Sequence, residues 1–147
     1  MTISLTIVGL GYVGLPLAQE ACRSGLAVTG LDTDSSVVAG LMSSVSHIDD
    51  IDSTGVAEML AAGFNATTDS TCIGNSDVII ICVPTPLDDD GTPDLSAVKA
   101  ATRTVSEHLQ PGSLVVLEST TYPGTTEDTV RPLLEEGSGL VAGIDFS

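Results

Sequence analysis

The chain has few positive charges. Lys and Arg together number 4 among 147 residues, against 20 Asp and Glu, which gives a formal net charge of −16. So acidic a chain is a poor partner for nucleic acid or for an anionic membrane surface. A phosphate-bearing ligand would therefore be held by backbone N–H groups and helix dipoles rather than by a lysine cluster.

Aromatic residues are also scarce, at 3%, and tryptophan is absent, while 42% of the residues are hydrophobic. The core must therefore be aliphatic, which suits the buried strands of a parallel sheet. The length is sufficient for one domain with a real core. No apolar run is long enough to span a bilayer, and no basic segment with a cleavage site precedes the first apolar run. We expect a cytoplasmic protein.

Cysteine is limited to Cys22, Cys72 and Cys82, which offer no paired disulfide framework and fit a reducing compartment. Their spacings match no zinc pattern, and His47 and His108 stand far from any such cluster. We expect no metal site. The thiols are expected to be small buried apolar groups rather than nucleophiles.

What the chain does have is a glycine pattern near its start. The apolar run Ile3–Val8 stops at Gly9, and Gly9, Gly11 and Gly14 then have the G-x-G-x-x-G spacing before a run of helix formers. Strand, tight turn and helix in this order form the phosphate-binding start of a dinucleotide fold. One glycine permits the turn, one lets the backbone approach a pyrophosphate, and one lets helix and strand pack closely. The first turn of the helix offers unpaired N–H groups and a positive dipole end.

An acid follows at the expected distance. The second apolar run, Leu26–Leu31, ends in Asp32, where a carboxylate accepts hydrogen bonds from the adenosine ribose hydroxyls of a dinucleotide. No Lys or Arg follows closely, and Asp34 adds a second negative charge, so NAD is favoured over NADP. The alternative is that Asp32 only caps the next helix.

Two later strands end in hydroxyl-bearing loops. The run Asp77–Val83 is β-branched without alternation, as in a central parallel strand, and stops where Pro84 precedes Thr85. The run Leu114–Leu117 is followed by a loop that contains Thr120. Ligands of open α/β sheets lie at the carboxyl ends of the strands, so Thr85 is expected near a nicotinamide or its ribose. The alternative is a threonine in an ordinary turn.

The remaining segments alternate between strand and helix with short connections. We predict a doubly wound, mostly parallel six-stranded α/β sheet of the Rossmann type. The further predicted elements are helices over 35–42, 55–62 and 95–109, a helix capped by Thr125 or Thr126, kinked at Pro132 and ended at Gly137, and strands over 64–67 and 140–146. Asp94 is predicted to cap the helix over 95–109, and 43–53 is predicted to be a solvated loop.

Four motifs in order carry a family resemblance. GLGYVGLPLA, the strand end at Asp32, VPTPLDDDGTPDLSAV and LVVLESTTYPGTTEDTV together resemble the NAD-binding domain of the nucleotide-sugar 6-dehydrogenases. This family comprises the UDP-glucose, GDP-mannose and UDP-N-acetylhexosamine dehydrogenases, and the likeness covers nearly the whole chain. The wording ESTTYPGTT is most similar to members that act on UDP-N-acetylglucosamine or a related UDP-sugar.

The resemblance implies oxidation of the sugar C6 alcohol to a carboxylate in two hydride transfers to NAD+. It assigns Thr120 a catalytic role, positioning or polarising a reacting water or alcohol, and makes Thr85 and Thr120 line the nicotinamide pocket. The residues matching the pyrophosphate turn and the ribose-binding acid are Gly9, Gly11, Tyr12, Val13, Gly14 and Asp32. Many members carry a lysine at the position of Val37, and this chain does not.

The family's nucleophilic cysteine, its central helix and its UDP-sugar-binding C-terminal domain match nothing in residues 1–147. The resemblance therefore implies a fragment, inactive alone, of a homodimeric enzyme that binds its UDP-sugar through the missing domain. Two alternatives stay open: the NAD domain of a β-hydroxyacid-type dehydrogenase, and a non-catalytic NAD(H)-binding sensor module.

Overall fold

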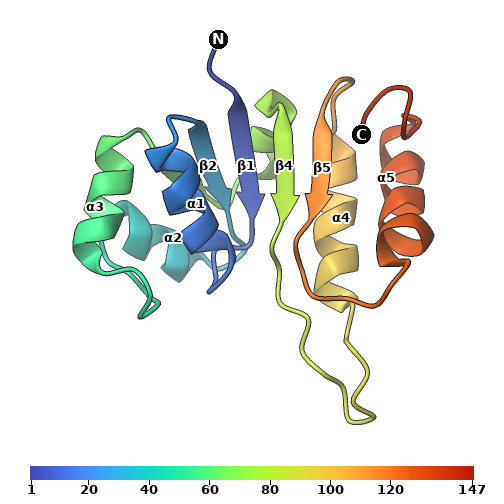
Figure 1. Cartoon of the computed structure of the whole chain (residues 1–147), viewed down its shortest axis with the longest axis horizontal. Helices are drawn as coiled ribbons and strands as arrows, with labels where there is room; N and C mark the ends of the chain where they lie inside the picture. Colours follow the sequence, from blue (N-terminus) through green and yellow to red (C-terminus); the bar gives the residue numbers. More distant parts are fainter.

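Five parallel strands form one sheet in the order β3-β2-β1-β4-β5 (Figure 1). The computed structural model describes all residues, 1–147. The strands are β1 Ser4–Val8, β2 Ala27–Leu31, β3 Asn65–Thr67, β4 Val78–Ile81 and β5 Leu114–Leu117. In the register, Val8 stands beside both Leu31 and Ile81, so the carboxyl ends of the central strands are level. The loops that follow these strands therefore meet at one edge of the sheet.

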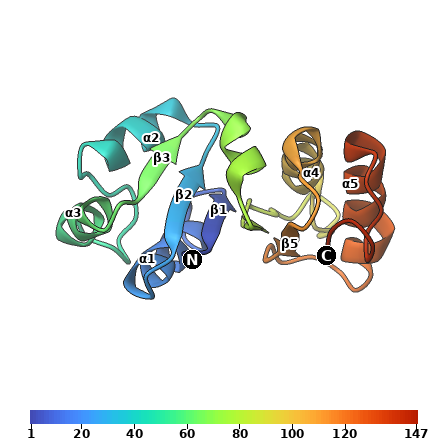
Figure 2. The same cartoon turned by 90° about the horizontal axis from the view of Figure 1, so that it is seen from above.

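Helices cover both faces of the sheet, with α1 on one side and α4 and α5 on the other (Figure 2). The helices are α1 Gly14–Arg23, α2 Ser35–Met42, α3 Ser53–Ala61, α4 Ser96–His108 and α5 Arg131–Ser138, with the 3₁₀ turn η1 Ser70–Asn75 and the π-helical turn η2 Thr126–Val130. None of these helices is long and apolar enough to cross a membrane. The doubly wound α/β prediction is confirmed.

The two faces bury separate cores that are mainly aliphatic, with one phenylalanine in each. Strand β4 shows why its sequence does not alternate: Ile79 and Ile81 are fully buried on the α4 side, while Val78 and Ile80 pack against the core beneath α1. A strand covered on both faces needs apolar residues at every position. The polar Thr6 in the central strand is buried too, and its hydroxyl lies 2.6 Å from that of Ser76.

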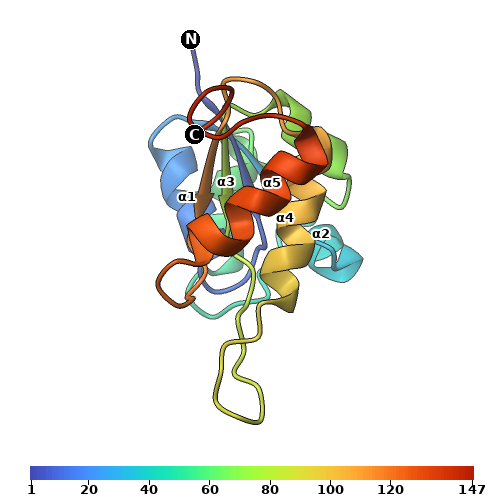
Figure 3. The same cartoon turned by 90° about the vertical axis from the view of Figure 1, so that its right-hand side faces the viewer.

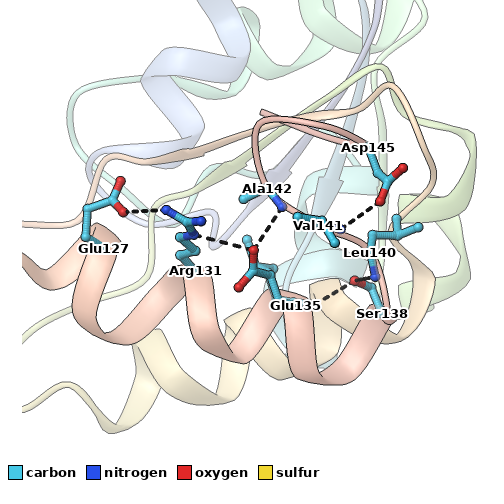
Figure 4. A network of polar contacts seen from close by, with 9 residues as sticks. Glu127, Arg131, Glu135, Ser138, Leu140, Val141, Ala142 and Asp145 are labelled. Atoms are coloured by element: carbon cyan, nitrogen blue, oxygen red, sulfur yellow. Dashed lines mark hydrogen bonds and ion pairs between the residues drawn. The ribbon is translucent and has the colours of Figure 1, made fainter.

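The predicted sixth strand does not form. Residues 140–146 instead make tight turns closed by a single bridge between Ala142 and Phe146. Figure 4 shows what holds these turns: the carboxylate of Glu135 accepts the N–H of Ala142 (3.0 Å), and that of Asp145 accepts the N–H of Val141 (2.8 Å). Side-chain acceptors on α5 and within the turn thus take the amides that a strand ladder would need.

Only the last residue reaches the sheet. The N–H of Ser147 donates to the Ser113 carbonyl (3.0 Å), and the N–H of Val115 donates to the Ser147 carbonyl (2.7 Å). This pattern is that of a parallel pairing beside Leu114 of β5. The six-strand prediction is therefore corrected to five strands with one paired residue at the edge.

The start of the last helix also differs from its prediction. Neither Thr125 nor Thr126 caps it with a side-chain bond, since the Thr125 hydroxyl donates back to the Tyr122 carbonyl (2.8 Å). The chain enters through the π-helical turn η2 and becomes α-helical at Arg131, directly before Pro132. Pro132 thus falls in the first turn of α5, where a proline's missing N–H is tolerated. The helix ends at Ser138, and Gly139 (φ +72°), not Gly137, supplies the left-handed end.

Between β4 and α4 the chain extends away from the sheet as a narrow hairpin (Figure 3). Its two arms are joined by backbone hydrogen bonds from Asp88 to Thr92 (2.8 Å) and from Asp94 to Pro86 (2.7 Å). The carboxylate of Asp94 then accepts the N–H of Ser96 (2.8 Å), the first residue of α4, but the N-cap position itself is taken by Leu95 and not, as predicted, by Asp94. The connection between β4 and α4 is thus a hydrogen-bonded hairpin that projects from the sheet.

Candidate functional site

A cleft of about 560 Å³ opens at the carboxyl ends of β1, β2, β4 and β5; we call it the edge cleft. It is lined by residues 9–13, 32–34, 37, 47, 82–85 and 118–120. It continues into a second cavity of about 480 Å³, the side cavity, which shares residues 9, 32, 33, 83 and 84 with it and is walled by α4. Every predicted site residue except Gly14 lines the edge cleft.

Four consecutive backbone amides at the mouth of this cleft, those of residues 11–14, donate no hydrogen bond within the protein. They lead into α1, which begins at Gly14, and residues 11–13 line the edge cleft. Unpaired N–H groups at a helix start, together with the positive dipole end, attract an anion. The turn can therefore hold a phosphate group without any cationic side chain.

Each of the three glycines meets a different steric demand. Gly9 has φ +95°, and a Cβ there would lie 2.9 Å from the carbonyl oxygen of Cys82 in the neighbouring strand end. A Cβ at Gly14 would overlap the carbonyl oxygen of Gly9, so helix and turn pack in direct contact. A Cβ at Gly11 would meet nothing within 4 Å, so open space lies beside this peptide. That space is what close approach of a diphosphate requires.

Asp32 lies at the junction of the edge cleft and the side cavity. One carboxylate oxygen accepts the N–H of Leu10 in the glycine turn, and the other accepts the N–H of Asp34 (both 2.9 Å). Capping of α2 falls to Asp34, which accepts the N–H groups of Ser36 and Val37. The hydroxyl of Ser36, followed by those two N–H groups, lowers the pKa of Asp34. The alternative that Asp32 only caps the next helix is therefore wrong.

The two threonine-bearing loops are joined to each other. The Thr85 hydroxyl donates to the carbonyl oxygen of Thr120 (2.6 Å), and the Ser119 hydroxyl donates to that of Val83 (2.7 Å). Thr85 and Thr120, 35 residues apart in sequence, thus meet at the β5 end of the edge cleft, opposite the β2 end that carries Asp32. Thr85 is more than an ordinary turn residue, because its side chain fixes a second loop.

The cleft carries acids and no strong base. Asp32, Asp34 and Glu118 line it, and neither the edge cleft nor the side cavity is lined by lysine or arginine. Cys82 lies at its floor, where burial, followed by the charge of Glu118, raises the pKa of the thiol to about 11. This cysteine is therefore a protonated thiol at neutral pH and a poor nucleophile.

Sequence reasoning missed two parts of the site. His47 lies in a segment predicted to be solvated, yet the neighbouring Ile48 and Ile51 are buried and bring it into the cleft. The small side chains Ala97, Ala101 and Thr104 of α4 form the wall of the side cavity. Both had a signal in the sequence: two isoleucines three apart, and small residues at helical spacing.

A parallel sheet with a glycine turn, unpaired amides at the following helix and an acid after the second strand defines a dinucleotide-binding domain of the Rossmann type. Residues 3–147 match the model of the "UDP-glucose/GDP-mannose dehydrogenase family, NAD binding domain". The chain belongs to this family and is its NAD-binding domain. Membership in this family replaces the alternative of a β-hydroxyacid-type dehydrogenase.

Two relatives illustrate the similarity. The chain is 45% identical over 145 residues to a UDP-N-acetyl-D-mannosamine dehydrogenase of Pyrococcus horikoshii, with 97% of this chain and 34% of the relative covered. It is 35% identical over 144 residues to a UDP-N-acetyl-D-glucosamine 6-dehydrogenase of Pseudomonas aeruginosa, with 98% and 33% covered. The chain thus spans about a third of the length of these curated relatives.

Solved structures agree. The structure of the Pyrococcus horikoshii UDP-D-ManNAc dehydrogenase superposes with a TM-score of 0.91 at 43% identity, covering 98% of this chain and 34% of that one. A ternary complex of GDP-mannose dehydrogenase from Pseudomonas aeruginosa gives 0.88 at 32% identity, covering 97% and 34%. The fold is therefore shared across members that are named for different nucleotide sugars.

Proposed function

We propose that this domain binds NAD+ in the edge cleft as part of a nucleotide-sugar 6-dehydrogenase. That enzyme would oxidise the C6 alcohol of a UDP-sugar to a uronate in two NAD+-dependent steps. The observation that carries the proposal is the run of unpaired amides at residues 11–14 beside the carboxylate of Asp32. A cleft with an anion-binding end and no lysine or arginine suits a diphosphate that is held by backbone.

Each part of the cleft has a proposed role. The backbone amides of Gly11, Tyr12, Val13 and Gly14 would hold the pyrophosphate, and Gly9 would allow the turn that presents them. Asp32 would accept the adenosine ribose hydroxyls with the lone pairs that Leu10 and Asp34 leave free. The side cavity, walled by small apolar residues of α4, is suited to the flat adenine ring.

The β5 end of the cleft would take the nicotinamide. Thr85 gives its hydroxyl hydrogen to the Thr120 carbonyl, so its oxygen remains an acceptor for a polar group of the cofactor. The Thr120 hydroxyl would donate to negative charge that develops on a reacting oxygen, which is its proposed catalytic role. Bound NAD+ supplies the hydride acceptor. The nucleophile is assigned to a part of the enzyme outside residues 1–147, because Cys82 is a buried thiol with a raised pKa and neither Cys22 nor Cys72 lines the edge cleft or the side cavity.

The UDP-sugar, the nucleophilic cysteine and a homodimer contact are accordingly assigned to further domains of a longer polypeptide that acts in the cytoplasm. An N-acetylhexosamine is the favoured sugar. The ESTTYPGTT motif supports it, and so do relatives named for UDP-N-acetylmannosamine and UDP-N-acetylglucosamine. The 147-residue chain is expected to bind NAD+ weakly and to catalyse nothing alone.

Calorimetric titration of the chain with NAD+ and NADP+ tests the cofactor assignment. NAD+ is expected to bind at least tenfold more tightly, because a 2′-phosphate would lie beside Asp32 and Asp34 without a cation to offset them. Equal affinity for the two, or no binding of NAD+, would contradict the proposal. Steady NADH formation from a UDP-sugar by this chain alone would show that it is a complete enzyme.

Two more measurements separate the remaining alternatives. A sensor module should bind NADH tightly and stay monodisperse in small-angle scattering, whereas a domain removed from its partners should bind weakly and tend to self-associate. The role of Thr120 can be tested in a chimera that carries residues 3–147 in place of the matching third of the Pyrococcus horikoshii relative. T120A should lower kcat for UDP-N-acetylmannosamine by about a hundredfold, with T120S close to the parent chimera. A T120A chimera with full kcat would remove Thr120 from the catalytic assignment.

A further inference from the structure

We propose that His47 is a positioning residue of the cofactor site. It holds the Leu10–Gly11 peptide so that the N–H of Gly11 faces the ligand. The inference rests on the proposed function of the edge cleft as an NAD+ site. It adds a residue that neither the glycine motif nor the ribose-binding acid includes.

The observation is that Leu10, between the first two glycines of the motif, is fixed at three points. Its N–H donates to the carboxylate of Asp32 (2.9 Å), and its carbonyl oxygen lies 2.6 Å from Nε2 of His47. Its side chain is fully buried against Gly30, where a Cβ would come within 2.7 Å of both Leu10 methyl carbons. The residue can neither rotate nor withdraw without breaking one of these contacts.

The carbonyl contact also identifies the donor. A carbonyl oxygen can only accept, so Nε2 of His47 must carry the hydrogen. The ring is presented by an anchored segment: the Ser46 hydroxyl donates to the Ile48 carbonyl (2.9 Å), and Ile48 and Ile51 are buried. The histidine is therefore held in place by its own segment as well as by its contact with the turn.

This hydrogen bond controls an amide because of peptide geometry. The Leu10 carbonyl and the Gly11 N–H belong to one planar trans peptide, in which they point in opposite directions. Fixing the carbonyl toward His47 thus fixes the first of the four unpaired amides away from it. Glycine at position 11 offers the backbone little resistance to a peptide flip, so an external restraint is needed.

The position of the ring in the fold supports the same role. His47 lines the edge cleft beside Asp34 and Val37, and it is the only basic side chain that does so. Asp32 holds the N–H side of Leu10 while His47 holds its carbonyl side. The ribose-binding acid and the pyrophosphate turn are thereby linked through a single residue.

The test compares H47Q, H47N and H47L in the 147-residue chain. The side-chain nitrogen of Gln falls near the position of Nε2, whereas that of Asn falls near Nδ1, so only H47Q keeps the donor. Calorimetry should show NAD+ and ADP binding about three- to tenfold weaker in H47L and H47N, and within about twofold of the parent in H47Q. Adenosine, which has no phosphate for the turn to bind, should bind equally to all four proteins.

A readout without ligand separates this inference from the proposed function. Hydrogen exchange of the Leu10 amide should be faster in H47L and H47N than in the parent and in H47Q, with melting temperatures close together. If the parent fails to bind NAD+, the proposed function fails, and the exchange data alone decide the role of His47. Unchanged exchange in H47L, parent-like NAD+ affinity in H47L, or H47Q as weak as H47N would overturn the inference.

Discussion

The two ends of the edge cleft are built in different ways. At the glycine turn, backbone packs on backbone: Gly14 is in direct contact with Gly9, and the side chain between them in the motif, Leu10, is fully buried. At the threonine end, the loops after β4 and β5 are largely exposed and are linked by side-chain hydroxyls to main-chain carbonyls.

The difference predicts how each end responds to substitution. Steric contact between backbone atoms leaves no room for a side chain at Gly9 or Gly14, so these two positions of the turn cannot change without a cost to the fold. A hydroxyl-to-carbonyl bond at the surface contributes little to folding, since water replaces it. The threonine end is therefore free to serve the chemistry, while the turn serves both fold and binding.

The largest effect should come from G14A, which places a Cβ onto the Gly9 carbonyl oxygen. We expect a loss of about 4 kcal/mol or more in the free energy of unfolding, because neither backbone segment can move away. Urea denaturation measures it. The matched control is G11A, where the Cβ meets nothing within 4 Å, so the fold should be kept while NAD+ binding weakens. Equal stability of the two variants would break the comparison.

Next in size is D32A, tested by calorimetry with NAD+. Loss of a carboxylate that accepts from the ribose, and that also holds the Leu10 N–H, should weaken binding by about tenfold or more. D34N is the control, since it keeps an N-cap acceptor on α2 and removes only charge. It should bind NAD+ no more weakly than the parent. Similar losses in D32A and D34N would point to general charge rather than a specific contact.

At the threonine end, T85A should lower stability by only about 0.5–1 kcal/mol, as measured by chemical denaturation. T85S keeps the hydroxyl that donates to the Thr120 carbonyl and should restore most of the stability that T85A loses. The contrast with the glycine turn would fail if T85A unfolded the protein as severely as G14A.

The smallest effect concerns the contact between Ser4 and Asp77, at the amino ends of the neighbouring strands β1 and β4. The carboxylate of Asp77 accepts the hydroxyl of Ser4 (2.7 Å) and its N–H (2.8 Å), and these bonds lower the pKa of Asp77 from 3.8. A lowered pKa means that the stabilisation is full above pH 3.8 and is lost as the pH falls through the lower, folded value. D77N should therefore be less stable than the parent at pH 6, and the gap should close below pH 3.8. A gap that widens with acid would contradict this sign.

Two of the predictions that the structure corrected concern residues 140–146 and residues 43–53. The composition of residues 140–146 suits a strand, but Glu135 of α5 and Asp145 take the amides of Ala142 and Val141 first. The segment 43–53 has a polar sequence, yet two buried isoleucines anchor it. The outcome for residues 140–146 depends on partners that local patterns do not connect. For residues 43–53 the spacing of Ile48 and Ile51 was a local signal, but the polar composition of the segment obscured it.

The sequence by itself determined the parallel sheet, the glycine turn and the acid after β2. These follow from the spacing of apolar and small residues, since backbone sterics act over a few positions. Only the tertiary structure decided that His47 meets Leu10, that Thr85 meets Thr120, and that α5 rather than β5 holds the residues before Ser147. Those contacts join positions from 7 to 37 residues apart. Their partners become neighbours only once the sheet has brought the strand ends to one edge and the helices have packed on its faces.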